Sequence, residues 1–201
     1  MAKYTDAICR KCRRAGTKLY LKGERCLSQK CAVTRRAYPP GKRGAQGTNR
    51  RVNDYAIQLT EKQKTKNSYA MLEKEFSNYY KKAAKSQNSG LALMTLLEMR
   101  LDNILKRAGF VASTRSARQI VTHEHVLVND KKVKSPNYQT KIGDKISINT
   151  QTVKIDKFFT DSPKWLKRHD NDRMVEVVAI PKREEMNPDL NEDLVIELYS
   201  K

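Results

Sequence analysis

Four cysteines near the amino terminus of this 201-residue sequence are spaced as metal ligands often are. Cys9 and Cys12 form one close pair, Cys26 and Cys31 form a second, and thirteen residues separate the two pairs. Two such pairs can converge on one tetrahedral ion, which thiolates bind at about 2.3 Å. The spacing therefore predicts one zinc ion per chain with a structural role. Two disulfides, four free thiols, a redox pair at Cys9 and Cys12, and an iron–sulfur cluster are the alternatives.

The region that holds the cysteines, residues 1–51, has few apolar side chains with which to build a core. A bound metal would supply folding free energy that so small a core cannot. Basic neighbours such as Arg10 and Lys11 favour the thiolate form that binds metal. The first residues lack the apolar segment of a signal peptide, so we expect a reducing compartment, where disulfides are disfavoured.

Positive charge is concentrated in two blocks of the chain. The sequence has 41 Lys and Arg against 22 Asp and Glu, a net charge of +19. Residues 1–51 have a net charge of +13, residues 100–148 of +6, and residues 149–201 of −2. Self-repulsion in the first block disfavours a compact state unless a polyanion neutralises it. We expect a nucleic acid rather than a membrane, because the block lacks the apolar stripe of an interfacial helix and no run of about 18 apolar residues exists.

The segment after the cysteines, residues 37–51, combines two prolines, three glycines and four basic residues, so it cannot form a regular element. It is either a flexible linker or an extended arm that lies along phosphates and orders on binding. Its basic residues favour the arm. On charge and position, the RNA contacts predicted in the first part of the chain are Arg10, Lys11, Arg13, Arg14, Lys22, Arg35, Arg36, Lys42, Arg43, Arg50, Arg51, Tyr55, Lys62 and Lys64.

Residues 52–88 have a helical pattern, with Thr60 and Gln63 matching a capping box. An aromatic and aliphatic stripe between Tyr69 and Ala83 recurs at helical spacing, which favours a buried core over a base-stacking platform. Near the carboxyl terminus the sequence predicts a strand at Met174–Ile180 and an apolar segment at 193–199. We expect that last segment to pack against the helices of residues 52–88.

Residues 97–148 predict a helix, a turn, a second helix and short strands. Apolar residues at helical spacing from Leu97 to Ala108 predict one helix that ends at Gly109. Ser113 or Thr114 can cap the second helix, which would end near His123. Strands are expected around the turns at Asn129-Asp130 and Gly143-Asp144. A small core with a cationic face is what a phosphate-binding module needs, although such charges also simply keep domains soluble.

The predicted fold class is therefore α+β. We expect a zinc-stabilised amino-terminal region with an extended arm over residues 1–51, and a helical domain formed by residues 52–90 with 185–201. An inserted α/β RNA-binding module, with helix-turn-helix and antiparallel strands, would span residues 91–184.

Catalysis is not expected. A helix would place His123 and His125 on different faces, so a metal site there is disfavoured. The sequence contains no P-loop, GxSxG, HExxH or GxGxxG motif. Two rival hypotheses are an RNA-modifying enzyme and a zinc-dependent DNA regulator. The first lacks residues for a catalytic domain, and the second lacks visible dimer symmetry and a recognition helix.

Short motifs in the second charged block resemble the RNA-binding module named after small-subunit ribosomal protein four. They are RLDNIL at 100–105, RAGF at 107–110, SARQIV at 116–121, HVLVN at 125–129 and GD at 143–144. That module also occurs in pseudouridine synthases and tyrosyl-tRNA synthetases, so alone it implies only RNA binding. DYAIQLTEKQK at 54–64, LYSK at 198–201 and the cysteine quartet with LKGERC at 21–26 are similar to the ribosomal protein four family itself, in its bacterial or organellar, metal-binding branch.

The resemblance implies a structural protein that binds small-subunit ribosomal RNA early, at a multi-helix junction of the five-prime domain. It implies organisation of the subunit body, proximity to messenger RNA beside small-subunit proteins three and five, an influence on translational accuracy, and no membrane. The expected location is the cytoplasmic ribosome, or an organellar one if the gene is organellar. By position in the module's motifs, the implied RNA contacts are Arg100, Asn103, Arg107, Arg115, Ser116, Arg118 and Gln119. From their position and charge, we also expect RNA contacts from Lys106, Ser113, Lys131 and Lys132.

Overall fold

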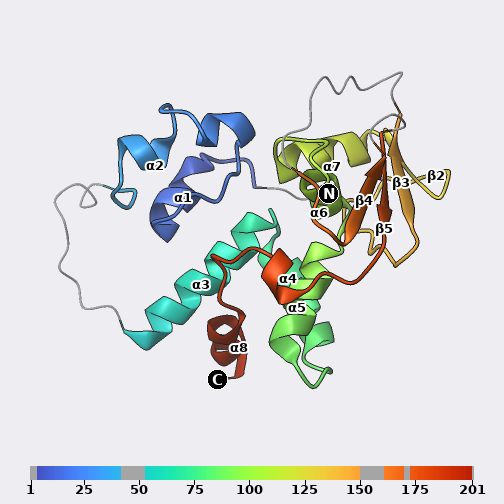
Figure 1. Ribbon diagram of the computed structural model, residues 1–201. Helices are drawn as coiled ribbons and strands as arrows, with labels where there is room; N and C mark the ends of the chain where they lie inside the picture. Colours follow the sequence, from blue (N-terminus) through green and yellow to red (C-terminus); the bar gives the residue numbers. More distant parts are fainter. Residues whose placement is uncertain (1–3, 42–52, 150–160, 170–172, 201) are drawn as a thin grey trace. The chain divides into compact units, whose positions relative to one another are not determined.

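The computed structural model describes residues 4–41, 53–149, 161–169 and 173–200 (Figure 1). The chain divides into two compact units, one made of Met1–Leu93 with Pro188–Lys201 and the other of Met94–Asn187. The first unit is therefore discontinuous in sequence, and the second is inserted between its two parts. None of the helices in the described segments has the length and apolar character needed to cross a bilayer.

The amino-terminal part of the first unit contains three short helical elements: α1 (Cys9–Ala15), the 3₁₀ helix η1 (Gly23–Cys26) and α2 (Ala32–Arg35). Gly16 ends α1 in the left-handed conformation, with φ of 72°. A small core of four buried side chains joins these elements: Ile8, Cys12, Leu19 and Leu21. So small a core agrees with the low apolar content of this part of the sequence.

The larger helices of the first unit are α3 (Asp54–Ser68), α4 (Glu73–Ala83), the first half of α5 (Ser89–Glu98) and α8 (Glu192–Ser200). Asn53 caps α3 by accepting a hydrogen bond from the Ala56 N–H at 2.9 Å. The predicted capping box at Thr60 is wrong, because Thr60 lies inside α3 and donates its hydroxyl to the Ala56 carbonyl at 2.7 Å. The predicted single helical region is broken where Ala70 has φ of 52°.

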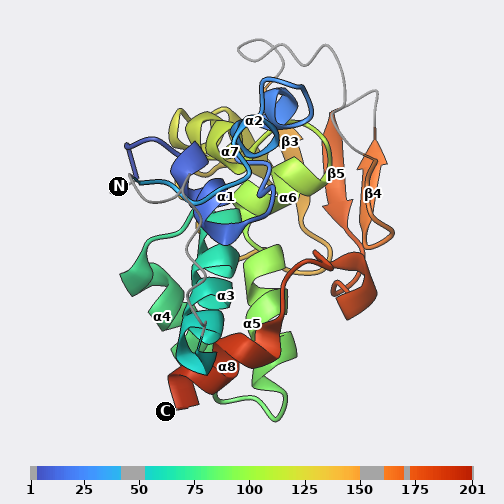
Figure 2. The ribbon, with the colours of Figure 1, turned by 90° about the vertical axis from the view of Figure 1, so that its left-hand side faces the viewer.

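The stripe predicted between Tyr69 and Ala83 is buried in part. Tyr69, Phe76, Tyr79 and Ala83 are buried, whereas Leu72 is 37% exposed. Helix α8 packs against α3, and the two lie side by side in both ribbon views (Figure 2). The expected packing of the carboxyl-terminal segment is confirmed, and Val195 of α8 is fully buried.

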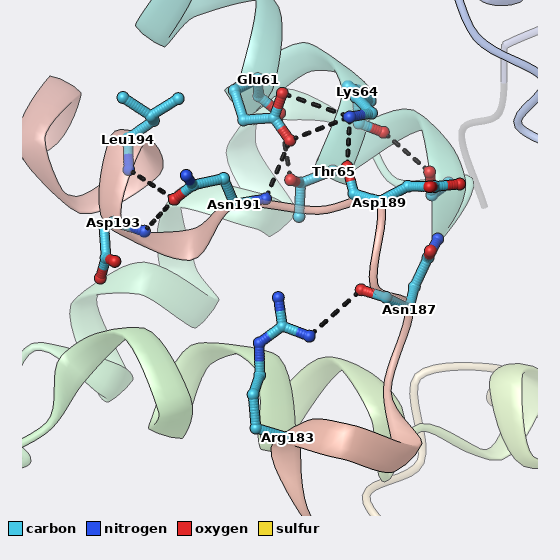
Figure 3. A network of polar contacts seen from close by, with 10 residues as sticks. Glu61, Lys64, Thr65, Arg183, Asn187, Asp189, Asn191, Asp193 and Leu194 are labelled. Atoms are coloured by element: carbon cyan, nitrogen blue, oxygen red, sulfur yellow. Dashed lines mark hydrogen bonds and ion pairs between the residues drawn. The ribbon is translucent and has the colours of Figure 1, made fainter.

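The chain that leads into α8 is tied to α3 by polar contacts (Figure 3). Lys64 donates to the carbonyl of Asp189, and Glu61 accepts a hydrogen bond from the Asn191 N–H at 2.9 Å. Asn191 in turn accepts from the backbone N–H of Asp193 at 3.0 Å and of Leu194 at 3.3 Å. Asn191 therefore both caps α8 and fixes where the helix begins.

The second unit combines two helices with a five-stranded antiparallel sheet. The helices are α6 (Leu101–Arg107) and α7 (Thr114–Thr122), and they share one hydrophobic core with the sheet (Figure 1). The strands are β1 (Val126–Val128), β2 (Lys131–Lys132), β3 (Lys145–Ile148), β4 (Leu166–His169) and β5 (Met174–Val177). Their order is β2-β1-β3-β5-β4. This arrangement of a helical region followed by a small antiparallel sheet confirms the α+β class.

The single helix predicted from Leu97 to Ala108 is wrong, because α5 ends at Glu98 and α6 begins at Leu101. Between them Arg100 is extended, with ψ of 140°. The Leu101 N–H donates to the Tyr138 carbonyl at 3.0 Å, and the Thr140 N–H donates to the Met99 carbonyl at 3.0 Å. Apolar periodicity continues through the break, so it could not reveal these contacts with a segment nearly 40 residues away.

The helix end, helix cap and turn that the sequence predicts in the second unit are confirmed. Gly109 has φ of 80° after the end of α6. Ser113 caps α7 by accepting from the Ser116 N–H at 3.3 Å. Asn129 and Asp130 both have positive φ, at 48° and 63°, which is the geometry of a type I′ hairpin turn between β1 and β2. The strand predicted at Met174 is β5, whereas β4 was not predicted.

Candidate nucleic-acid interface

The outer face of α7 presents polar and basic side chains. Arg115 and Gln119 are exposed, Ser116 is half-buried, and Arg118 keeps 14% of its side-chain surface exposed. Ala117 and Val121 point into the core and hold the helix in place. The capping of α7 by the buried Ser113 fixes the position of its first turn. The structure therefore brings Arg115, Ser116, Arg118 and Gln119 together on one helix.

A second basic feature of the module is the β1–β2 hairpin. Lys131 and Lys132 are exposed on β2, which is an edge strand. The side chain of Asn129 braces the turn, because it donates to Asp144 at 2.9 Å and accepts from the Lys145 N–H at 3.0 Å. The two lysines therefore extend from a hairpin with a defined shape and are accessible to a polyanion.

Arg100 needs a correction, because it was expected on the RNA face and is completely buried. Its guanidinium donates to Asp102 through Nε at 3.0 Å and Nη2 at 2.8 Å, and to Asn137 at 3.0 Å. Asp102 is equally buried. A buried guanidinium needs such partners, since removing a charge from water is costly unless it is paired and hydrogen-bonded. Arg100 therefore has an internal role.

Asn103 needs the same correction, and Arg107 needs a partial one. Asn103 is buried and donates to the carbonyl of Glu98 at 3.0 Å and to its carboxylate at 2.6 Å. Arg107 holds the same carboxylate through two hydrogen bonds of 3.0 and 2.5 Å, while 28% of its side chain remains exposed. Glu98 is therefore the buried anchor of both side chains. Lys106, on the same helix, is half-buried.

The basic residues of the amino-terminal region differ in their surroundings. Arg13 donates to the carbonyls of Tyr38 and Pro39 at 3.0 and 3.3 Å, and its guanidinium lies 4.7 Å from the Tyr38 ring centroid. The Lys11 ammonium lies 3.8 Å from the Tyr4 ring centroid. These two cations therefore stabilise the local fold. The exposed members of the predicted set in this region are Arg10, Arg14, Lys22, Arg35 and Arg36.

On α3 the predicted contacts Lys62 and Lys64 have partners within the first unit. Lys62 forms an ion pair with Glu73 at 2.7 Å, and Lys64 forms one with Glu61 at 3.3 Å. Both lysine side chains are mostly buried. Both lysines therefore have structural partners, and their assignment to an RNA surface stays a prediction. Tyr55 on the same helix is 56% exposed. The predicted contacts Lys42, Arg43, Arg50 and Arg51 lie outside the described residues.

The four cysteines are free thiols, and one of them, Cys12, belongs to the small amino-terminal core. Cys12, Cys26 and Cys31 are buried, and Cys9 is half-buried. The Lys22 N–H donates to Cys26 Sγ at 3.4 Å. Burial raises the pKa of Cys12, the backbone of Leu19 lowers it through a hydrogen bond, and the other three cysteines raise it further. For Cys31 burial also raises the pKa, but hydrogen bonds from Thr34 and Val33 outweigh it and lower the pKa overall.

The thiols therefore lie near enough to influence one another's ionisation, and backbone N–H groups point toward several of the sulfurs. Both features suit a thiolate-bound metal. Within the described segments, however, no group of three or more His, Cys, Asp or Glu side chains is arranged to hold a metal ion. The donor set fits zinc in its chemistry, but the four sulfurs are not drawn together around one point in this structure.

The two histidines after α7 stack with ring centroids 6.0 Å apart and an angle of 10° between the planes. His123 is exposed and His125 is half-buried. The chain turns between them, where Glu124 has φ of 62°, so the helical spacing used to separate them does not apply.

Sequence reasoning did not single out the acceptors that hold the arginines: Asp102, Glu98 and Asn137. The signal that could have found Asp102 is its position two residues after Arg100 at the start of a helix. Asn137 gives no local signal, because its contact with Arg100 spans 37 residues.

Taken together, a helix-turn-helix and an antiparallel sheet display a basic helix and a lysine hairpin, which is the class of a nucleic-acid-binding protein with a small recognition module. Residues 3–98 match the family described as "Ribosomal protein S4/S9 N-terminal domain", and residues 99–146 match the "S4 domain". Full-length relatives are similar throughout. Small ribosomal subunit protein uS4 of Syntrophomonas wolfei is 43% identical, uS4A of Clostridium acetobutylicum 44%, and uS4 of Clostridium beijerinckii 46%, each with the whole of both chains covered.

The chain therefore belongs to the small ribosomal subunit protein uS4 family. This is a family of structural proteins, so the expectation that the chain is not an enzyme is confirmed by its membership. The hypotheses of an RNA-modifying enzyme and of a DNA regulator are set aside for the same reason.

Proposed function

We propose that this protein is a structural component of the small ribosomal subunit that binds small-subunit ribosomal RNA. The observation that carries the proposal is the polar and basic face of the second unit. Arg115 and Gln119 are exposed and Arg118 is partly exposed on α7, and Lys131 and Lys132 are exposed on β2. Full-length similarity to proteins named for the small ribosomal subunit supports it.

The side chains of this face are better suited to binding phosphate and sugar groups than to entering the deep groove of an RNA duplex. That groove is too narrow for side chains, whereas phosphates, 2′-hydroxyls and junctions are accessible. Arginine and lysine on a rigid module would position the protein on folded RNA rather than read a base sequence. Recognition of RNA shape is the expected mode.

The finer role follows from the resemblance in the sequence. The protein would bind early, at a multi-helix junction in the five-prime domain, and would organise the body of the subunit. It would lie beside small-subunit proteins three and five, near messenger RNA, and would influence translational accuracy. The charge of residues 1–51 supports the idea that the arm at 37–51 lies along RNA.

Binding to RNA fragments tests the proposal directly. The full-length protein is titrated against transcripts of the five-prime domain and of another domain of small-subunit ribosomal RNA, at several salt concentrations. We expect tighter binding to the five-prime domain, with an affinity that falls steeply as salt rises. Equal affinity for both transcripts at all salt concentrations contradicts the role in the five-prime domain, and absence of RNA binding contradicts the function as a whole.

We also propose that Cys9, Cys12, Cys26 and Cys31 hold one zinc ion, as in the four-cysteine branch that the sequence resembles. Support comes from the mutual influence of the four thiols on the pKa of Cys12 and from N–H donors at the sulfurs. Zinc would supply folding free energy to a region whose core has only four buried side chains. An iron–sulfur cluster is the alternative group that four thiolates could bind, and metal analysis distinguishes it from zinc.

A further inference from the structure

Asp102 lies between two guanidinium groups, one wholly inside the second unit and the other at its surface. The inner partner is Arg100, which binds both carboxylate oxygens at 3.0 and 2.8 Å. The outer partner is Arg118 of α7, whose Nη1 lies 3.5 Å from Oδ2 of Asp102. Arg100 and Asp102 have no exposed side-chain surface, whereas 14% of Arg118 is exposed.

Two guanidinium groups share one carboxylate in this cluster, so the three side chains together have a net positive charge. A net positive charge attracts anions such as phosphate. Arg100 cannot contact such an anion because it is buried. Of these three side chains Arg118 is the one with exposed surface, so it offers the contact to an approaching anion, and its neighbours Arg115 and Gln119 are exposed on α7.

Arginine binds phosphate best when its planar group is already held in place. Its donors form a rigid fork, and less side-chain entropy is lost on binding if the group is fixed beforehand. The Asp102 carboxylate is itself fixed, because Arg100 binds both of its oxygens and Asn137 holds Arg100 at 3.0 Å. The chain Asn137–Arg100–Asp102–Arg118 therefore supports a surface arginine from within the fold.

We propose that Asp102 is a positioning residue for RNA binding, which holds the Arg118 guanidinium in place as a preorganised contact for an RNA phosphate. The inference deepens the proposed RNA-binding function and rests on it. Arg118 is thus distinct from Lys131 and Lys132, which contribute as exposed charges on a hairpin.

Asp102→Asn tests the role of the carboxylate in RNA binding. The variant should bind RNA more weakly if Asp102 positions Arg118, and more tightly if only the negative charge of Asp102 matters. Removing a negative charge near RNA should tighten binding if charge alone matters. Loss of positioning should instead weaken binding to the five-prime domain transcript by about tenfold. Glu73→Gln is the matched control: it removes one negative charge and disturbs two ion pairs, but in the first unit. It should not weaken binding.

Arg118→Lys tests the arginine without disturbing the buried pair of Arg100 and Asp102. It keeps the charge but loses the planar fork, so we expect a loss of affinity of about five- to tenfold with an unchanged salt slope. If Arg118 had only a structural role, the Arg118→Lys variant would not combine lower RNA affinity and an unchanged salt slope with the thermal unfolding of the wild type. This variant decides the question if Asp102→Asn does not fold.

The outcomes separate the inference from the function on which it rests. If the wild-type protein does not bind the transcript, the proposed function fails. If it binds and Arg118→Lys has wild-type affinity, the inference is overturned. A folded Asp102→Asn variant with unchanged or tighter binding also overturns it. Weaker binding by both variants, with the Glu73→Gln control unaffected, supports it.

Discussion

Tyr199 stacks on Tyr80, with ring centroids 4.2 Å apart and an angle of 16° between the ring planes. The pair joins the last turn of α8 to α4, and the Tyr199 hydroxyl reaches Glu73 at the start of α4, 3.2 Å away. Burial raises the pKa of Tyr199, and the nearby Glu73 carboxylate raises it further. The Tyr199 side chain therefore joins α8 to α4 through a ring contact and a hydrogen bond.

Tyr199→Ala should destabilise the first unit by about 1–3 kcal/mol, because it removes a stacked aromatic pair and a hydrogen bond to a carboxylate. Denaturant unfolding followed by circular dichroism measures the change. Tyr55→Ala is the control, since Tyr55 is 56% exposed and its loss should cost less than about 0.5 kcal/mol. If both variants lost the same free energy of unfolding, the contact between α8 and α4 would contribute nothing to stability.

Glu73 should make the first unit sensitive to acid. Hydrogen bonds from Lys62 and Lys66 outweigh the effect of burial and lower the pKa of Glu73 from 4.5 to about 2. The folded state therefore prefers the ionised carboxylate, so its stabilisation is complete above pH 4.5 and is lost as the pH falls toward 2. The Glu73 side chain is 48% exposed, so solvent screening limits the contribution to about 1 kcal/mol or less.

Thermal unfolding of Glu73→Gln measures this effect. The variant should be less stable than the wild type near neutral pH, and the difference should shrink between pH 4.5 and pH 2. A difference that stays constant across this range would assign the acid sensitivity to other groups.

Arg100→Met should destabilise the second unit by about 3–5 kcal/mol, because it leaves the buried Asp102 carboxylate without its main partner. Near-ultraviolet circular dichroism during urea unfolding follows the module through Trp165, which is buried in its core. Arg115→Met makes the same chemical change at an exposed position and should alter stability by less than about 0.5 kcal/mol. A small effect of Arg100→Met would mean that Asp102 is satisfied by Arg118 alone.

Replacing Lys131 and Lys132 together by alanine should weaken RNA binding through charge. We expect the slope of log affinity against log salt to fall by about one for each lysine that contacts a phosphate. Stability should change little, since both side chains are exposed on an edge strand. An unchanged slope, measured by filter binding, would remove the hairpin from the interface.

Cys26→Ser should lower the zinc content of the purified protein well below the one ion per chain that we expect for the wild type. Hydrogen exchange should become faster within residues 4–41, whereas the core of the second unit should keep its protection because it is separate. Metal analysis of the wild-type protein that finds no zinc, or an absorption band of an iron–sulfur cluster, would contradict the assignment.

Local chemistry in the sequence predicted the parts of the fold that depend on a few neighbouring residues. The cap at Ser113, the turn at Asn129-Asp130 and the end of a helix at Gly109 are of this kind. Each requires particular side chains or a positive φ, so the residue type carries the information. The break between α5 and α6 is different, since the backbone of Tyr138 and Thr140 stabilises it from far along the chain.

The same distinction applies to the candidate interface. Residue type and position correctly gathered Arg115, Ser116, Arg118 and Gln119 on one helix, because helical spacing is local. Charge alone misplaced Arg100, whose side chain is buried with its partner Asp102. A basic residue can serve an internal carboxylate or an external phosphate, and only the fold decides which.

The discontinuity of the first unit has a consequence for the order in which this protein folds during its own synthesis. Chains emerge from the ribosome with the amino terminus first, and domains generally fold as units. The second unit, which ends at Asn187, is complete before any residue of α8 has been made. The first unit must therefore wait, with the side of α3 that packs against α8 uncovered, until residues 188–200 arrive. A chain released early would have a folded module attached to an incomplete helical unit, in which Gln58 of α3 lacks its hydrogen bond to Glu197 of α8.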